Sequence, residues 1–337
     1  MAGALAEEAA ELVGIDPTVE TILEVQLKSG MIPWYPGGHA DPWNHVEAVM
    51  ALSAAGEFAA AARGLEWLAG AQRPDGSWHA SYSGDGSVEE PRIDTNGVAY
   101  VATGVLHHLF ASGDLGCAEE MFAVVDAALG FVVALVRPAG DIPWSVEPSG
   151  RPAAFSLLAA SSSIHESLRS GTRLATALGR ERPAWEEAAA RVGRLIAEQE
   201  SFFADNSQFA MDWYYPVLAG VLGGRDARAR LRARFAEFVW PAAGVLCRAD
   251  RRWVTTAETA ECAVAFARVG WAAEASRLLS TTDDLRRDDG SYTTGLVYPE
   301  RSEFPPGERT TYSAAAVVVA ADVLAGGVGA ALFDRLR

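Results

Sequence analysis

Two segments far apart in the chain follow the same spacing of marker residues. They cover residues 41–82 and 261–292, and each contains an apolar stretch, a glycine, a second helical stretch and an Asp-Gly-Ser-aromatic turn. In both segments a glutamate lies 9 residues before the glycine and an aspartate lies 19 residues after it. Helical periodicity on both sides of a glycine turn predicts a pair of antiparallel helices. A helical hairpin that recurs in this way predicts a repeat architecture.

The spacing of apolar residues divides the whole chain into helical segments. Positions three and four apart recur over twelve stretches: 6–29, 43–55, 57–72, 95–112, 116–136, 156–178, 182–200, 209–222, 226–238, 255–269, 271–281 and 310–325. Twelve helices make six hairpins, and a closed ring of hairpins accounts for a chain of 337 residues. We therefore expect an all-α protein, a single (α/α)6 toroid domain over residues 1–337, with inner and outer rings of helices.

The links between these helices alternate in character. Five are short and centred on glycine, whereas the alternate links are longer and hold most of the Trp, Tyr, His and acidic residues. The longer links are 31–43, 75–94, 138–155, 202–212, 241–255 and 288–309. Alternate links of a ring of hairpins lie on opposite faces, so the longer links are expected to share one rim. We expect the active site there, because functional residues concentrate on loops held by a rigid scaffold.

Charge and cysteine content limit the possible partners. The net charge of −16 argues against binding to nucleic acid or anionic membranes, which both attract basic surfaces. No stretch resembles a signal peptide or a membrane span. The three cysteines lack metal-type spacing and are expected to be reduced thiols of a cytoplasmic protein. A small-molecule substrate is expected, with no cofactor or metal site predicted, although a divalent metal stays possible and the oligomeric state is open.

The densest cluster of polar residues lies at the start of the second helix. It comprises His39, Asp41, Asn44, His45 and Glu47. A buried acid beside histidines acts well as a general acid or base, which makes the cluster a candidate for catalysis and substrate binding. The alternative is a network of capping and turn hydrogen bonds, with Asp41 before a proline that opens the helix.

Further acidic residues stand at the starts of other inner helices. Asp94 directly precedes one of them, where catalysis and helix capping explain an aspartate equally well. Glu258 and Glu261 are three residues apart and share a helix face. Two acids on an inner face are costly unless they are paired or used. His165 on an inner helix is either a core residue or a catalytic one.

Aromatic residues cluster in the same links. Asp212 stands among three aromatic residues, whose faces stabilise a cation or stack on a sugar, although core packing explains the rings alone. The rim pocket is expected to be lined by Trp34, Trp43, Trp144, Trp213, Tyr214, Trp253 and Tyr292. Arginines of the rim, Arg309 among them, either pair with the acids or clamp a phosphate.

One family resemblance rests on the repeated turn. Residues 63–68, followed by Gln72 and the Asp-Gly-Ser-Trp turn at 75–78, resemble the QW repeat of terpene cyclases, as found in actinobacterial prenyltransferase-like proteins. Residues 308–314 resemble the last repeat of protein prenyltransferase β subunits. This resemblance implies an α/α toroid that performs acid-initiated carbocation chemistry on an isoprenoid-type substrate.

The chain departs from that family at its catalytic motifs. Only Asp94 stands where a class II cyclase carries DxDD, so the proton donor would be Asp94, Asp41 or Asp212. All six histidines lie in the first half of the chain, so the family's zinc site is not expected. No strict DDxxD element for magnesium diphosphate is present. The isoprenoid enzyme is nevertheless the leading prediction.

A second, looser resemblance is to six-hairpin glycosidases of the glucoamylase type. It rests on an acid after a tryptophan, Trp144 to Glu147, and on the late Tyr-Pro-Glu run that ends at Glu300. The resemblance implies Glu147 as general acid and Glu300 as general base. The alternative prediction is therefore a glycosidase or sugar-converting enzyme that uses this pair or the cluster of Asp41 and Glu47. A toroid without activity that binds a partner is the third possibility.

Overall fold

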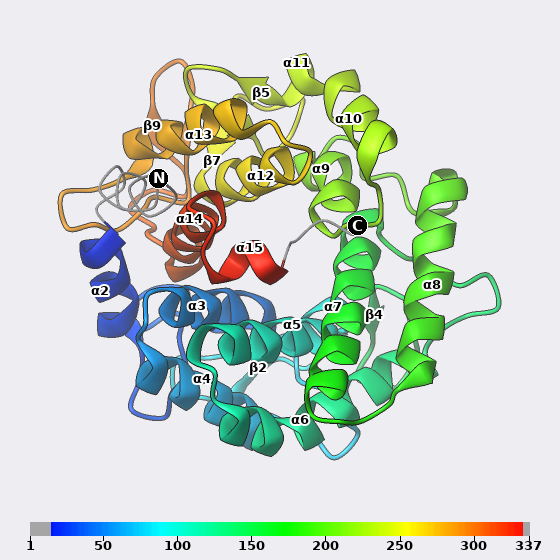
Figure 1. Cartoon of the computed structure of the whole chain (residues 1–337). Helices are drawn as coiled ribbons and strands as arrows, with labels where there is room; N and C mark the ends of the chain where they lie inside the picture. Colours follow the sequence, from blue (N-terminus) through cyan, green and yellow to red (C-terminus); the bar gives the residue numbers. More distant parts are fainter. Residues whose placement is uncertain (1–14, 333–337) are drawn as a thin grey trace.

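The computed structural model describes residues 15–332, which form two concentric rings of helices (Figure 1). The inner ring consists of α3 (Pro42–Ala54), α5 (Thr95–Ser112), α7 (Leu158–Ala177), α9 (Ala210–Leu218), α12 (Thr256–Arg268) and α14 (Thr311–Leu324). Each inner helix packs against the next one in this order, and α14 packs against α3. The predicted (α/α)6 toroid is therefore confirmed.

The outer ring covers the inner one. It consists of α2 (Ile15–Val25), α4 (Phe58–Ala71), α6 (Leu115–Ala134), α8 (Pro183–Glu198), α10 (Gly224–Ala233) and α13 (Ala272–Ser280). Shorter helical pieces are η1 (Glu200–Phe202), α11 (Phe235–Phe238), η2 (Thr281–Leu285) and α15 (Val328–Leu332). The predicted helix over 226–238 is divided between α10 and α11, and α15 was not predicted. The predicted helix at 6–29 begins outside the described residues.

Aspartate caps explain where two of the inner helices begin. The Asp41 carboxylate accepts a hydrogen bond from the backbone N–H of Asn44 at 3.0 Å, and Pro42 occupies the first turn of α3. The Asp94 carboxylate likewise accepts the N–H of Asn96 at 3.0 Å at the start of α5. The capping interpretation is confirmed for both aspartates, and it fixes both side chains at the ends of inner helices.

Short antiparallel strands join the long links to one another. They are β1 (Ser81–Tyr82), β2 (Val88–Glu90), β3 (Ile93–Asp94), β4 (Ser145–Val146), β5 (Val239–Trp240), β6 (Gly244–Leu246), β7 (Trp253–Thr255), β8 (Gly295–Val297) and β9 (Ser302–Glu303). The last five form one sheet, in which Val254 pairs with Leu296. Strand β3 pairs with β4. The long links therefore lie together at the N-terminal ends of the inner helices, as the alternation of links predicts.

The opposite end of the ring is closed by other elements. The short helix α15 lies across the centre of the ring in Figure 1 and packs against α5 and α14. The Arg173 guanidinium of α7 donates to the carbonyl oxygens of Ala331 and Leu332 at 2.9 and 3.1 Å. The toroid is therefore a bowl that opens at the rim of long links. Among the helices of residues 15–332, none combines the length and apolar character needed to span a bilayer.

Candidate active site

Three connected cavities lead from the rim to the centre of the ring. The outer cavity, of about 340 Å³, is lined by Trp34, His39, Asp41, Pro42, Trp43, Asn44, Ala80, Ser81, Glu90, Arg92, Asp94 and Gly97. The middle cavity, of about 140 Å³, is lined by Trp43, Asn44, Glu47, Met211, Trp253, Thr255, Ala257, Glu258, Glu261, Thr294, Tyr312 and Ala316. The inner chamber is lined by Glu47, Tyr100, Thr103, Ser163, Glu166, Tyr215, Leu218, Ala219, Glu261, Val264, Ala316 and Val319. The outer and middle cavities share Trp43 and Asn44, and the middle cavity and the inner chamber share Glu47, Glu261 and Ala316. The three cavities therefore adjoin one another, and together they are called the path.

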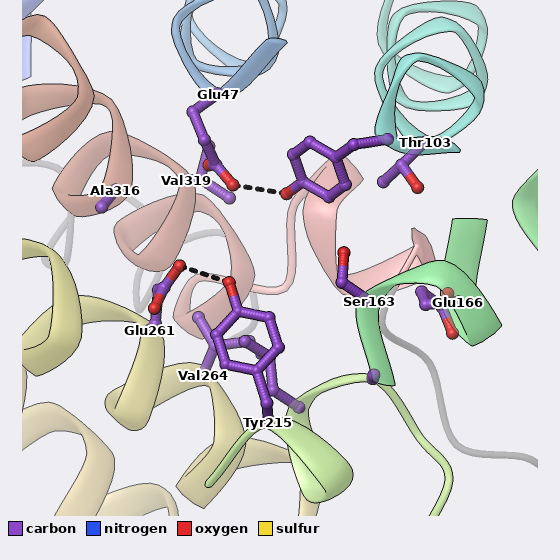
Figure 2. Close-up of a pocket in the computed structure, with 12 residues that line it drawn as sticks. Glu47, Thr103, Ser163, Glu166, Tyr215, Glu261, Val264, Ala316 and Val319 are labelled. Atoms are coloured by element: carbon purple, nitrogen blue, oxygen red, sulfur yellow. Dashed lines mark hydrogen bonds between the residues drawn. The ribbon is translucent and has the colours of Figure 1, made fainter. Parts of the chain in front are cut away.

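Two glutamates stand where the middle cavity meets the inner chamber. Figure 2 shows Glu47 of α3 and Glu261 of α12, each bonded to a tyrosine hydroxyl. Tyr100 donates to Glu47, and Tyr214 and Tyr215 donate to the two oxygens of Glu261. Burial raises the pKa of Glu47 to about 7 and that of Glu261 to about 8. Both groups can therefore hold a proton near neutral pH.

Aromatic rings form the wall beside these glutamates. The Trp43 ring stacks on the Tyr100 ring with centroids 4.7 Å apart, and the Tyr215 ring is 6.0 Å from Trp43. Trp43 also lines the outer and middle cavities. An apolar ring face next to carboxyl groups is the combination that holds a sugar ring while its hydroxyls find polar partners.

Asp41 is held in a fixed orientation at the outer cavity. Its Oδ2 accepts the Trp34 indole N–H at 2.5 Å and the Asn44 side-chain amide at 2.7 Å. Charged carboxylates accept such hydrogen bonds more strongly than neutral groups do. Asn44 also lines the middle cavity, so it connects the Asp41 carboxylate to the space in front of Glu258.

Glu258 enters the middle cavity from the other side of the ring. It lies in the first turn of α12 and accepts the Thr255 hydroxyl at 2.5 Å. Trp253 and Tyr312 line the same cavity. Carboxyl groups from α3 and α12 therefore stand on different walls of one path.

Asp94 lines the outer cavity together with Asp41. Burial raises its pKa to about 6, the charge of Asp41 contributes a smaller rise, and the nearby Arg92 opposes it. The Arg92 guanidinium lies 4.5 Å over the Trp144 ring, which holds it at the cavity wall. Two carboxyl groups on one wall thus differ in their surroundings, which is how a fold gives neighbouring acids different roles.

The structure brings many of the residues predicted from sequence into this path. The carboxylates Asp41, Glu47, Asp94 and Glu258 line it, and so do His39, Trp34, Trp43, Asn44 and Trp253. The two other predicted histidines contact protein only. His45 is fully buried, where its Nδ1 accepts the Ile32 N–H at 3.1 Å and its Nε2 lies 2.9 Å from the Gly64 carbonyl oxygen. His165 Nδ1 lies 2.9 Å from the Ala189 carbonyl oxygen of α8.

Other predicted residues lie behind the cavity walls. Asp212 accepts the Ala159 N–H at 3.1 Å and thereby connects α9 to α7. Trp213, Tyr214 and Tyr292 are fully buried and do not line the three cavities. Trp144 stacks on Phe155 with ring centroids 5.8 Å apart.

The pair taken from the glucoamylase resemblance lies outside the path. Glu147 forms a turn in which its N–H donates to the Arg151 carbonyl oxygen, and Glu300 is exposed. Neither lines any of the three cavities. Arg309 is exposed and lies 3.4 Å from Asp289, beside the rim.

Several lining residues were not singled out from sequence. Tyr100 and Thr103 face the inner chamber, and their spacing of three on a helix behind a capping aspartate is a signal that could have found them. Tyr312 is the second residue of α14, as Trp43 is the second residue of α3. Residues 15–332 contain no group of three His, Cys, Asp or Glu side chains placed to hold a metal ion.

Comparisons with known proteins identify one curated relative and several solved structures with the same fold. The chain matches no family model. The "MMP endo-(1,4)-3-O-methyl-alpha-D-mannosidase" of Mycolicibacterium hassiacum is 44% identical over 307 residues, which cover 91% of this chain and 85% of that protein. A solved glycosidase in complex with glucose has a TM-score of 0.76 at 18% identity, covering 95% of this chain and 98% of that one. A cellobiose 2-epimerase from Spirochaeta thermophila has a TM-score of 0.71 at 14% identity, covering 96% and 98%.

These findings define the class of protein. The (α/α)6 toroid is a fold that this chain shares with solved glycosidases and sugar epimerases, and the curated relative is a glycosidase. The chain belongs to the family of the Mycolicibacterium hassiacum endo-mannosidase.

The leading prediction from sequence was therefore wrong. The mannosidase relative overturns the isoprenoid cyclase or prenyltransferase and favours the alternative, a glycoside hydrolase. The resemblance misled because the Gln and Asp-Gly-Ser-Trp residues perform a structural task. The Gln72 amide donates to the carbonyl oxygens of Gly76 and Val124, and the Trp78 indole donates to that of Leu68. These hydrogen bonds serve the helical hairpin and no particular reaction.

Proposed function

We propose that this protein is a glycoside hydrolase that cleaves internal linkages of an α-1,4-linked polysaccharide of 3-O-methylmannose units. The substrate comes from the name of its mannosidase relative, with which it shares 44% identity. The single observation that carries the proposal within the molecule is the row of adjoining cavities from rim to centre, each lined by both carboxyl groups and aromatic rings.

Glycoside hydrolysis needs two carboxyl groups on different sides of the sugar. One, the general acid, protonates the glycosidic oxygen of the leaving group. The other acts as a general base on water or as a nucleophile at the anomeric carbon. Asp41 and Glu258 are our candidates for these positions, because Asp41, the cap of α3, lines the outer cavity, and Glu258 of α12 lines the middle cavity that adjoins it at Trp43 and Asn44. We assign the role of general base or nucleophile to Asp41, because three N–H donors fix the orientation of its carboxylate, and the role of general acid to Glu258.

Neighbouring groups support this pair. Trp43 supplies a ring face for the sugar next to the glutamates of the inner chamber. Asp94, whose pKa is raised to about 6, stays partly protonated beside Asp41, so the wall does not carry two full charges at weakly acidic pH.

Substitution of the pair tests the assignment. We expect Asp41→Asn and Glu258→Gln each to lower kcat on a methylmannose oligosaccharide by about 100-fold or more, because each removes one general acid or base. Asp94→Asn keeps the helix cap and is expected to retain most activity. The acidic limb of its pH–activity profile is expected to shift, because the amide does not titrate. Release of reducing ends measures turnover, and circular dichroism checks folding.

Two outcomes contradict the assignment. If Asp94→Asn is inactive while Asp41→Asn is active, Asp94 takes the place of Asp41. If the unchanged protein releases no sugar from the methylmannose chain or from its disaccharide, the hydrolase proposal itself is overturned.

A further inference from the structure

A fourth cavity opens on the rim beside the outer cavity. This side groove, of about 470 Å³, is lined by Tyr35, Pro36, Pro305, Pro306, Gly307, Glu308 and Arg309. It lies between the links 31–43 and 288–309, and none of its lining residues belongs to the three cavities of the candidate active site. Its volume is in the range of small-molecule sites.

The aromatic side chain of the side groove is fixed in place. A Cβ built on Gly38 would lie 2.6 Å from the Tyr35 ring, so the absence of a side chain at Gly38 lets the ring lie against the backbone. The Gly38 N–H also donates to the Tyr35 carbonyl oxygen at 2.9 Å. Proline rings on both links restrict the backbone on either side. Little conformational freedom therefore remains for a ligand to remove on binding.

Aromatic contacts connect the side groove to the candidate catalytic carboxylates. The Tyr35 and His39 ring centroids are 6.3 Å apart, His39 and Trp34 are 4.4 Å apart, and Trp34 and Tyr312 are 4.9 Å apart. His39 and Trp34 line the outer cavity, and Tyr312 lines the middle cavity with Glu258. The rings thus follow one track from the side groove to the centre.

Polar groups complete the side groove. Glu308 accepts the Thr294 hydroxyl with Oε1 at 2.8 Å, which fixes its carboxylate at the groove wall. The Arg309 guanidinium is exposed and offers several N–H donors. Ring faces together with acceptors and donors are what a sugar with apolar and hydroxyl faces requires.

We propose that the side groove is a remote subsite that binds sugar units of the same polysaccharide chain outside the cleavage position. The proposal rests on the proposed hydrolase function. The aromatic track runs from Tyr312 at the middle cavity to Tyr35, and it offers a linear chain held at the carboxylates a route along the rim. Binding there favours long chains over short ones.

Kinetics on substrates of two lengths test the subsite. The measured quantity is the ratio of kcat/KM for a long methylmannose chain to kcat/KM for the disaccharide. We expect Tyr35→Ala to lower this ratio by about tenfold, the loss of one ring contact. Tyr35→Phe keeps the ring and is expected to keep the ratio. Phe202→Ala removes an exposed aromatic ring outside the four cavities and serves as the matched control.

The outcomes separate the two proposals. A wild-type enzyme that cleaves both substrates, with an unchanged ratio in Tyr35→Ala, overturns only the subsite. Failure of the wild-type enzyme on both substrates overturns the hydrolase function on which the subsite depends. Arg309→Ala is the second variant if Tyr35→Ala does not fold, because it leaves the packing on Gly38 intact, and it is also expected to lower the ratio.

Discussion

Two buried glutamates dominate the electrostatics of the centre. Glu47 and Glu261 face the same chamber, and burial raises their pKa values to about 7 and about 8, against an ordinary value of 4.5. The charge of Glu47 adds to the rise at Glu261. The tyrosine hydroxyls that donate to both groups oppose the shift without cancelling it. The folded protein therefore holds protons that the unfolded chain releases between about pH 4.5 and 8.

This linkage predicts a loss of stability as the pH rises. The contribution of both groups is complete below about pH 4.5 and disappears as the pH passes through 7 to 8, on the order of a few kcal/mol in total. We expect Glu261→Gln to reduce the fall in melting temperature between pH 5 and pH 8, because the amide does not ionise. Calorimetry at several pH values measures the slope.

Glu187→Gln, an exposed position on α8, is the control for that experiment. Its slope is expected to equal that of the wild-type protein. An equally steep slope in Glu261→Gln would show that Glu261 is already ionised in the folded state.

The sequence predicted the role of a single residue only where its neighbours in the chain distinguished a structural role from a chemical one. Asp41 stood out because a capping aspartate was accompanied by polar neighbours, and those neighbours do surround it. His45 belonged to the same cluster, yet it faces α4 because its position on α3 turns it outward. Position on a helix face depends on the exact phase of the helix, which periodicity determines to within a few residues.

Glycine turns at the ends of outer helices connect one hairpin to the next. A Cβ built on each would approach the backbone of a neighbouring outer helix: Gly30 at Arg63 of α4, Gly76 at Ala127 of α6, Gly140 at Arg191 of α8, and Gly290 at Pro17 of α2. All four have positive φ. The contact of Gly290 with α2 joins the late part of the chain to its start. These turns are therefore joints of the outer ring.

Gly76 offers a matched test of this role. Asp75-Gly76-Ser77 and Asp85-Gly86-Ser87 are the same tripeptide, with φ of +89° and +83° at the two glycines. A Cβ on Gly76 would lie 2.3 Å from the Ala127 carbonyl oxygen, whereas Gly86 has no atom within 4 Å. We expect Gly76→Ala to cost about 3 kcal/mol or more, and Gly86→Ala about 1 kcal/mol from its positive φ alone. Urea unfolding of both variants measures the difference, and equal costs would show that the turn does not bear on α6.

The repeated hairpin was predictable because its markers have structural causes. The Gln72 amide donates hydrogen bonds to the carbonyl oxygens of Gly76 in the turn and Val124 on α6. The Gln26 amide makes the equivalent hydrogen bonds to the carbonyl oxygens of Gly30 and Ala60 on α4. The contact between neighbouring hairpins requires these residue types, so their pattern in the sequence indicates the architecture. It carries no information on the substrate, which is why the same pattern suggested an isoprenoid enzyme.

At the scale of the whole molecule, the bowl is closed at one end by α15. Leu332 is buried, and Gly329 of α15 donates its N–H to Asp322 of α14 at 2.5 Å. The neighbouring His107 of α5 is fully buried with a pKa lowered by burial to about 4. Periodicity over so short a helix gives no signal, so this closure could not be predicted from sequence.

Removing α15 tests whether the floor of the bowl maintains the central chamber. We expect a chain that ends at Gly327 to melt at a lower temperature, because the buried surface of α5 and α14 becomes exposed. Water that enters from below would also relax the burial that raises the pKa of Glu261, so the loss of stability between pH 5 and pH 8 should become smaller. Arg173→Ala removes two hydrogen bonds to α15 while leaving the helix, and it should lower the melting temperature less. A shortened chain with the melting temperature and pH slope of the full protein would show that the ring alone keeps its centre closed.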